Sequence, residues 1–404
     1  MSKHRAGART ILFVSSVSAL YGAERSLLEI INVMSPAWMP WFVVPAKGPY
    51  SAALEEAHYP YDVIPMPDGG RRFFLAALRL AWIIRKRRAG LVHANLHHTV
   101  PIVAIASKLS GVPFVAHIRN MISEPLGDHT KRPFHAAAAG ICISRAVKNA
   151  AFEAGVFSPE QYDRIWIIPD SRNLSKYAHG KRAAIRAELG LSEDVPLVGM
   201  IARIEPMKGQ HIFLEAAALI ADQMPTARFL LVGDADWHRD YLAMLKRRCE
   251  DPRLKRRVTF LGYRRDVPDI LAALECFAHP SSRGAFVSVL IEAMAAGIPL
   301  VVSDVDGIPE CVGRDGAAEL IDSLEPTVWA NAILQLMRDP ERRASMTRAG
   351  RERAKRYDAT RVGPETEDVF AHCLSRDLDR LSPAQAKPIA MNENSGRRAS
   401  DQRA

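Results

Sequence analysis

The amino-acid sequence predicts an α/β protein with two Rossmann-like domains, each built on a doubly wound parallel sheet. Short apolar strands alternate with helical segments, which is typical of parallel sheets covered by helices on both faces. The alternation occurs in two series, one before and one after a polar stretch near residue 180. The chain has 404 residues, and at about 100–200 residues per domain this length suggests two domains.

The first series contains six expected strands: ILFVSSV from Ile11, WFVVPA from Trp41, YDVIPM from Tyr61, LVHAN from Leu91, PFVAHI from Pro113 and GICIS from Gly140. The second series begins near Pro196 and contains LVGMIAR, RFLLVGD, VTFLGY, CFAHPS and LVVSD. We therefore expect an N-terminal domain over residues 1–180 and a C-terminal domain over 190–360. Residues 361–381 should form a final helix that packs back across the cleft. The polar tail, 382–404, lacks periodicity and should be disordered.

Composition narrows the class of protein. Five scattered cysteines without a CxxC pair argue against a disulfide framework or a thiolate zinc site. No run of about 18 apolar residues exists, so we expect neither a membrane span nor a signal peptide, and a cytoplasmic location. The formal net charge of +9 favours polyanionic partners such as nucleotide phosphates or an anionic membrane face. An Arg-rich solvated surface explains the same charge equally well.

In open parallel sheets, ligands bind beyond the carboxyl ends of the strands. Arg203 and Lys208 bracket the turn after LVGMIA, where two cations could hold and neutralise a diphosphate. Tyr263 and Arg264 follow VTFLG and could stack on a base. Surface positions that flank a loop are the alternative for Arg203 and Lys208, whereas the role of Tyr263 and Arg264 stays open.

An acid-x-acid pattern follows the strand RFLLVG. It begins at Asp234, and the same pattern recurs at residues 304–306 and 377–379. Three occurrences in one chain carry little information about metal binding, so we expect no metal site.

The stretch GAFVSVLIEAMAAGIPLVVS, residues 284–303, is typical of a loop, a helix and a strand. A loop that feeds a helix exposes backbone N–H groups at the positive end of the helix dipole, which is an anion site. Glu292 lies within this apolar helix. Ribose hydroxyls would be suitable neutral partners for its carboxylate, whereas an exposed helical Glu fits its apolar neighbours less well.

Taken together, these segments resemble the retaining GT-B glycosyltransferases of family 4, also called glycosyl transferases group 1, over about residues 10–360. Val232-Gly233-Asp234-Ala235 resembles the family's VGDG loop, and LGYRRDV from Leu261 matches LGxxxDV. The segment IEAMAAGIPLVVS from Ile291 matches LEAMAxGxPVVAS, and DGIPE from Asp306 matches GGxPE.

The resemblance implies the GT-B fold, with an acceptor-binding N-terminal domain and a C-terminal domain that binds a UDP- or GDP-linked sugar. It implies that Arg203 and Lys208 hold the donor diphosphate and that Glu292 binds the ribose. Amides near Val287, Ser288 and Val289 would meet the phosphates or the sugar.

The implied activity is retaining sugar transfer to a saccharide or lipid-linked acceptor. It would serve cell-surface polysaccharide, lipopolysaccharide or glycolipid synthesis. No metal, no other cofactor and no nucleic acid would be involved.

One departure from the family pattern leaves alternatives open. The family usually carries a second glutamate eight positions before Glu292, and this chain has Gly284 there. Either the donor sugar is recognised differently, or activity is weak or lost. Asp306, where the family usually has Gly, could supply the carboxylate. A non-catalytic nucleotide-sugar-binding protein and a nucleotide-sugar epimerase on the same fold are therefore alternatives.

Two segments of the first half are further candidates. Tyr21-Gly22-Ala23-Glu24 resembles the family's GGAE loop; Gly22 would permit close backbone approach, and Arg25 could reach a phosphate or an acceptor. A simple Gly-containing turn is the alternative. His117 and Arg119 follow the strand PFVA, where related enzymes place a His or an HxR segment that contacts the sugar or the acceptor.

For the HxR segment, the alternative is a strand-end His that is bonded to a loop carbonyl. The remaining histidines carry less information about function. The spacing of His93, His97 and His98 does not match a zinc-binding helix.

The segment 71–90, which begins at Arg71 and ends at Gly90, is both basic and apolar. It could lie on an anionic membrane surface with Phe73, Phe74 and Trp82 inserted. We favour instead a domain helix that packs Leu75, Leu78 and Trp82 on the sheet. A peripheral enzyme on the inner face of the plasma membrane would reconcile both interpretations.

Overall fold

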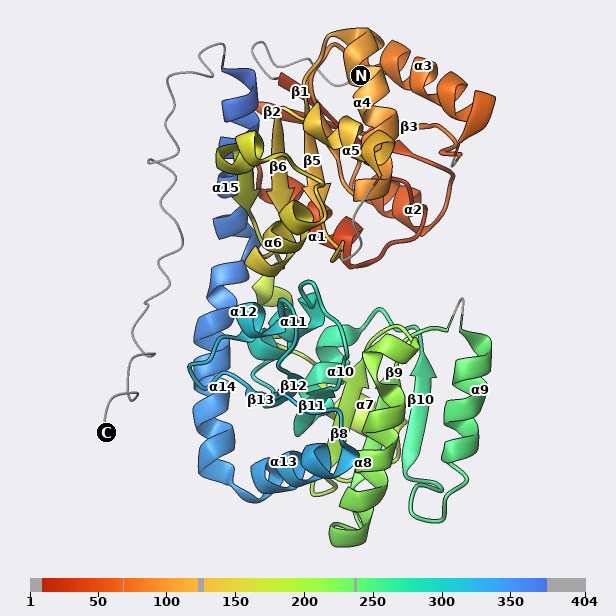
Figure 1. Ribbon diagram of the computed structural model, residues 1–404. Helices are drawn as coiled ribbons and strands as arrows, with labels where there is room; N and C mark the ends of the chain where they lie inside the picture. The colour runs from red at the N-terminus through yellow and green to blue at the C-terminus, as the bar shows by residue number, and fades with distance from the viewer. Residues whose placement is uncertain (1–8, 68, 123–126, 236–237, 376–404) are drawn as a thin grey trace, which may run out of the picture.

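The protein consists of two α/β units, one above the other in Figure 1. The computed structural model describes residues 9–67, 69–122, 127–235 and 238–375. One parallel sheet has seven strands and the other has six. The predicted fold class, two doubly wound parallel-sheet domains, is confirmed.

The first sheet has the strand order β3-β2-β1-β4-β5-β6-β7. Its strands are β1 (Arg9–Val14), β2 (Trp38–Val44), β3 (Tyr61–Val63), β4 (Ala89–Ala94), β5 (Phe114–Ile118), β6 (Ala139–Cys142) and β7 (Ile165–Ile167). Its helices are α1 (Gly22–Val33), α2 (Pro49–Glu56), α3 (Gly70–Lys86), α4 (Val100–Ser110), α5 (Asp128–His135) and α6 (Arg145–Glu153), with 3₁₀ turns η1 (His97–Thr99), η2 (Pro159–Arg164) and η3 (Leu174–Tyr177). The six expected strands are present, and β7 is an additional edge strand.

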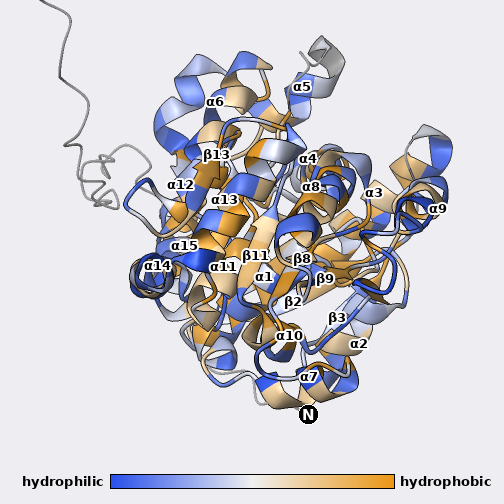
Figure 2. Cartoon of the chain, turned by 90° about the horizontal axis from the view of Figure 1, so that it is seen from below, coloured by the Kyte–Doolittle hydropathy of each residue, from blue (hydrophilic) through white to orange (hydrophobic). Residues whose placement is uncertain are grey.

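The second sheet has the strand order β10-β9-β8-β11-β12-β13. Its strands are β8 (Leu197–Ile201), β9 (Arg228–Val232), β10 (Val258–Gly262), β11 (Cys276–His279), β12 (Leu300–Ser303) and β13 (Glu319–Ile321). The helices are α7 (Arg182–Glu188), α8 (Gln210–Gln223), α9 (Arg239–Arg248), α10 (Val267–Ala273), α11 (Ser288–Ala296), α12 (Ile308–Val312), α13 (Pro326–Arg338) and α14 (Pro340–Ala354), with η4 (Pro206–Lys208) and η5 (Lys355–Tyr357). The inner strands of both sheets are largely buried under helices. Figure 2 shows apolar β8 and β11 inside a rim where α14 is largely hydrophilic.

The last helix, α15 (Ala359–Leu374), returns to the first unit after α14 has followed the second (Figure 1). Val369 and Phe370 are fully buried in a core that includes Phe13. The carboxylate of Glu367 accepts hydrogen bonds from Ser35 N and Trp38 Nε1 at 2.7 and 2.9 Å. Apolar burial and these bonds attach α15 to the first sheet. The predicted domain limits stay predictions, and the tail expected to be disordered, 382–404, lies outside the described residues.

Helix α3 differs from the interpretation that the sequence favoured. Leu75, Leu78 and Trp82 do not pack on the sheet, because they are 54%, 42% and 55% exposed. The helix has a second apolar face made of smaller and branched residues, and that face is the buried one: Ala76, Ala77, Leu80, Ala81, Ile83 and Ile84. Phe73 is half-buried against the core, whereas Phe74 is exposed. Among the helices that the structure describes, none is long and apolar enough to cross a membrane.

Candidate functional site

The loop that carries Arg203 and Lys208 packs against the loop after β11. A β-carbon on Gly209 would lie 1.9 Å from Pro280 O, and Gly209 has φ +77°, so the close approach requires glycine. Ser281 Oγ donates to Met207 O at 2.9 Å. The two loops follow the neighbouring strands β8 and β11, so the paired cations lie beside the segment that leads into α11.

Arg203 and Lys208 affect each other electrostatically. Burial lowers the pKa of Lys208, Glu205 opposes this effect, and the positive charge of Arg203 adds to it. Arg203 itself is about half exposed and pairs with Glu205 at 3.2 Å. Its guanidinium lies 5.7 Å from the ring centre of Tyr21, at the start of α1 in the first unit. Two cations near one another at the boundary between the units are suited to an anionic ligand.

The N-terminus of α11 faces the glycine loop of the first unit. Val287 is the N-cap residue, and no side chain caps the helix. A β-carbon on Gly22 would lie 3.7 Å from Ser288 Oγ and 3.9 Å from Arg172 Nη2, which are ordinary contact distances. Gly22 therefore lies against the beginning of α11, although the neighbouring atoms do not themselves require glycine there. Val289 follows in the first turn and is half-buried.

Glu292 has a protein partner that sequence reasoning missed. Its Oε1 accepts a hydrogen bond from Arg172 Nε at 2.5 Å, and both side chains are buried. Arg172 lies 120 positions away in a polar segment that shows no periodicity, so nothing local in the sequence identifies the pair. Burial alone would lower the pKa of Arg172, but the Glu292 carboxylate raises it above its ordinary value.

His117, at the end of β5, and Arg119, just after it, are both buried, and their contact with the sugar or the acceptor stays a prediction. His117 Nδ1 lies 3.1 Å from His93 Nε2, and its Nε2 has no partner among the described residues. Burial and the charge of Arg119 hold the pKa of His117 well below its ordinary value. The pKa of His93 falls to about 3 for the same reasons, so both rings are neutral near pH 7.

Arg119 connects the first sheet to the linker, the segment that joins β7 of the first unit to α7 of the second. Its guanidinium pairs with Asp170, and Nε donates to Asn95 O and Oδ1, each at 3.2 Å. Asn95 Nδ2 in turn donates to Glu24 Oε1 at 3.3 Å, and burial raises the pKa of Glu24. This buried network joins the glycine-loop helix to the linker.

Tyr263 and Arg264 occupy different environments. Tyr263 is half exposed and accepts a hydrogen bond from Arg25 Nη2 at 2.6 Å, which joins the loop after β10 to α1. Arg264 is held by two carboxylates, those of Asp266 and Glu188. Arg25 therefore contacts the second unit, and the guanidinium of Arg264 binds carboxylates of its own unit.

Gly233 and Asp234 have a structural explanation. Gly233 has φ +146°, and a β-carbon there would lie 1.8 Å from Ala202 O, so glycine is required where β8 and β9 end. Asp234 is exposed, and its Oδ1 accepts from Ala235 N at 2.7 Å.

Gly284 and Asp306, both departures from the family pattern, are in direct contact. Gly284 N donates to Asp306 Oδ2 at 2.9 Å, and Arg283 Nε lies 3.7 Å from the same oxygen. A β-carbon on Gly284 would lie 2.9 Å from two side-chain atoms of Ile308. The position therefore has no room for the missing glutamate unless Ile308 moves.

The rings of His97 and His98 lie 3.7 Å apart from centre to centre and are tilted by 42° relative to each other. Within the described ranges, no group of three or more His, Cys, Asp or Glu side chains could hold a metal ion.

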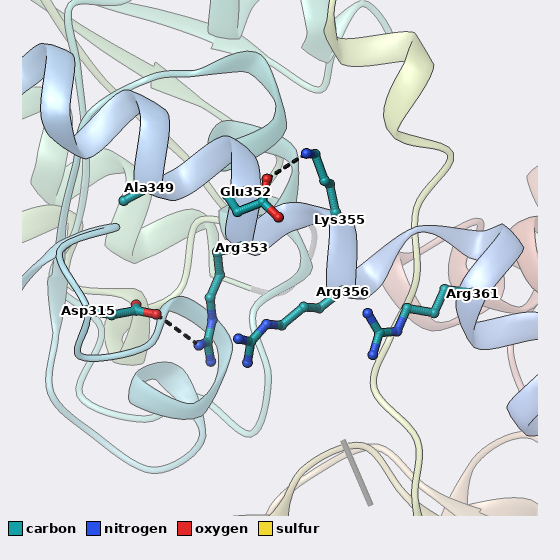
Figure 3. Close-up of a pocket in the computed structure, with 7 residues that line it drawn as sticks. All are labelled: Asp315, Ala349, Glu352, Arg353, Lys355, Arg356 and Arg361. Carbon is teal, nitrogen blue, oxygen red and sulfur yellow. Dashed lines mark hydrogen bonds and ion pairs between the residues drawn. The ribbon is translucent and has the colours of Figure 1, made fainter. Parts of the chain in front are cut away.

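A basic cavity of about 410 Å³ lies where the chain passes from α14 to α15. Its charged lining residues are Asp315, Glu352, Arg353, Lys355, Arg356 and Arg361. Figure 3 shows Arg353 and Arg356 side by side, with Asp315 paired to Arg353 at 3.7 Å. The cavity borders the crossover, the segment in which the chain passes from α14 through η5 to α15. The crossover lies beside the linker, since Tyr357 O accepts from Arg172 N at 2.9 Å.

Comparisons with known proteins agree with this architecture. The family model described as Glycosyl transferases group 1 matches residues 181–353, and the model described as Glycosyltransferase Family 4 matches residues 21–175. D-inositol 3-phosphate glycosyltransferase of Segniliparus rotundus is 30% identical over 286 residues, which are 69% of this chain and 60% of that protein.

An Escherichia coli protein named UDP-Gal:alpha-D-GlcNAc-diphosphoundecaprenol alpha-1,3-galactosyltransferase is 28% identical, over 64% of this chain and 68% of its own. The crystal structure of Anabaena HepE in complex with UDP and glucose has a TM-score of 0.77 and 26% identity. It covers 89% of this chain and 99% of HepE. The two family models together span most of the chain and correspond to its two units. The chain therefore belongs to the GT-B glycosyltransferases, in the families described as Glycosyltransferase Family 4 and Glycosyl transferases group 1.

Proposed function

We propose that the protein is a retaining, metal-independent glycosyltransferase that moves a sugar from a nucleoside-diphosphate donor to a hydroxyl of a saccharide or lipid-linked acceptor. One observation carries the proposal. The cation pair Arg203 and Lys208 and the uncapped N-terminus of α11 lie at the boundary with the first unit, where Gly22 faces Ser288. Together they would bind a diphosphate. The UDP in the HepE structure supports this donor class.

The reaction follows from where charge develops. The acceptor oxygen forms a bond to the anomeric carbon as the bond from that carbon to the diphosphate breaks. Arg203 and Lys208 stabilise the negative charge that builds on the leaving diphosphate, and the diphosphate takes the acceptor proton. Attack on the face that the leaving group vacates retains the anomeric configuration. No carboxylate nucleophile is needed, so Gly284 does not prevent this route.

The exposed face of α3 supports a membrane partner. Phe74, Leu75, Leu78 and Trp82 lie on this face among the exposed cations Arg71, Arg72, Arg79, Arg85 and Lys86, and the helix contains no acidic residue. Apolar insertion and attraction to anionic lipid would act together there. A peripheral position on the inner face of the plasma membrane would bring a lipid-linked acceptor to the enzyme. The diphosphoundecaprenol acceptor in the name of the E. coli relative is of this kind.

Incubation with labelled UDP- and GDP-sugars tests the proposal. Transfer of label to a saccharide or lipid-linked acceptor, with retained configuration by NMR, is the expected result. Binding without turnover would support the non-catalytic alternative that Gly284 motivates. Conversion of the donor sugar itself would support an epimerase, and failure to bind any donor would overturn the proposal.

A further inference from the structure

The linker between the units contacts one face of helix α11 at two points one turn apart. Ser288 and Glu292 are four residues apart in the helix and so lie on the same side. Ser288 Oγ donates to Asp170 Oδ2 at 2.8 Å, and Arg172 Nε donates to Glu292 Oε1 at 2.5 Å. Two linker residues that are two positions apart, Asp170 and Arg172, therefore contact successive turns of the same helix face.

The position of Arg172 is fixed by the crossover between the units. Its N–H donates to Tyr357 O and its carbonyl accepts from Ala359 N, each at 2.9 Å. Nη1 donates to Ser171 O at 2.8 Å. Asp170, two residues earlier in the chain, forms an ion pair with Arg119, which follows β5 of the first sheet. The guanidinium is thus set by the crossover and the linker, whereas Glu292 belongs to the second unit.

Stability alone does not account for this pair. Arg172 is 4% exposed and Glu292 is 7% exposed. Removing two charges from water carries a desolvation cost that their mutual attraction often fails to offset. A buried pair is therefore better explained where it fixes an orientation that the protein uses.

The geometry leaves one carboxylate oxygen for a ligand. Arg172 occupies Oε1 of Glu292, and Oε2 makes no hydrogen bond within the described part of the chain. An ionised carboxylate oxygen can accept from more than one hydroxyl. Arg172 Nη2 and Ser288 Oγ both lie near Gly22, which begins α1 and faces the start of α11.

We propose that Arg172 is a positioning residue that orients the Glu292 carboxylate toward the ribose hydroxyls of the donor nucleotide. The inference rests on the proposed function and extends it. Binding of the ribose then depends on the linker as well as on the second unit, because the residue that aims the carboxylate is held outside that unit.

The experiment compares the affinities of the full chain for UDP and for 2′-deoxy- and 3′-deoxy-UDP by calorimetry. In the wild type, loss of the hydroxyl that Glu292 binds should weaken affinity about tenfold or more, as expected for a hydrogen bond to a charged group. Arg172→Met should bring that ratio close to one, and Glu292→Gln should do the same. The double variant should be no weaker than either single variant, and Arg172→Lys should restore part of the ratio.

Two further variants separate positioning from loss of folding. Arg172→Met/Glu292→Gln leaves no unpaired buried charge, so it should fold even where a single variant is unstable. Arg186→Met is the matched control, since Arg186 is 1% exposed and pairs with Glu275 within the second unit. It should lower the melting temperature and leave the ribose ratio unchanged.

Three outcomes would overturn the inference. Arg172→Met could weaken UDP and both deoxy analogues equally, the effects of the two single variants could add in the double variant, or the wild type could show no preference for either ribose hydroxyl. If the wild type binds neither UDP nor its analogues, the proposal of a UDP-type donor fails with it. UDP binding with an unchanged ratio in Arg172→Met would overturn only the positioning role.

Discussion

Asp306 accepts a hydrogen bond from the main-chain amide of Gly284 at 2.9 Å. Both positions depart from the pattern of the family that the chain belongs to. Asp306 has φ +48°, a left-handed conformation that few residues other than Gly, Asn and Asp adopt readily. The two departures therefore form one local arrangement, in which the Asp306 carboxylate is bonded to the main chain of the loop that carries Gly284.

Gly284→Glu should destabilise the protein instead of restoring a family-like site. The new side chain would meet Ile308 at 2.9 Å and Val287 at 3.1 Å, and overpacking of this kind costs about 1–3 kcal/mol. Urea unfolding measures the change. Gly69→Glu is the control, because nothing lies within 4 Å of a β-carbon at that position. Equal stability of the two variants would show that Ile308 yields easily.

Lys208→Ala should weaken UDP binding about tenfold or more and leave uridine binding unchanged. A charge-assisted hydrogen bond contributes about 1.5–3 kcal/mol, and only the diphosphate could receive it. Calorimetry with both ligands measures the difference. Lys246→Ala removes the same charge from the exposed side of α9 and should have no effect. A parallel loss of uridine affinity would contradict the assigned role.

Trp82→Ser and Leu78→Ser should reduce binding to anionic liposomes, because they remove exposed apolar side chains from α3. Co-sedimentation should require anionic lipid and should decrease as salt rises. Leu324→Ser is the matched control, since Leu324 is 45% exposed in the second unit. Binding that is independent of salt, or absent in the wild type, would remove the membrane surface from the proposal.

His279→Leu should make stability less sensitive to acid. Burial, with the charge of Lys208, lowers the pKa of His279 from 6.5 to about 3, so the unfolded chain takes up a proton that the folded chain refuses. This contribution is fully present above pH 6.5 and is lost as the pH falls toward 3. The slope of unfolding free energy between pH 6 and 4 should decrease by about 1.4 kcal/mol per pH unit. An unchanged slope in His279→Leu would contradict the prediction.

Most of the fold was predictable because alternation of apolar strands and helices is a local property of the chain. Edge strands β7 and β13 were not predicted, and each has only three residues. Strand β3 is equally short, but it lies in the longer strand-like stretch YDVIPM and was predicted. Helix α3 shows a different limit. Its sequence contains apolar residues on two faces, and periodicity does not indicate which face the sheet covers. Leu75 and Leu78 were therefore assigned to the wrong face.

The candidate site was predictable in its parts but not in its connections. Arg203, Lys208 and the loop before α11 each follow a strand, so the rule for parallel sheets locates them. Arg119 pairs with Asp170, which lies 51 positions away, and Arg172 pairs with Glu292, which lies 120 positions away. No local pattern links residues at such separations.

The sequence by itself determined the two sheets, the loops at their carboxyl ends and the family, because these depend on short patterns and their order. Only the tertiary structure decided which charges meet. It paired Glu292 with Arg172 and placed Asp306 against Gly284. It also turned outward the face of α3 that carries the larger apolar side chains. The reason is physical: burial and pairing depend on distances between segments that are far apart in the sequence, and these distances exist only once the chain has folded.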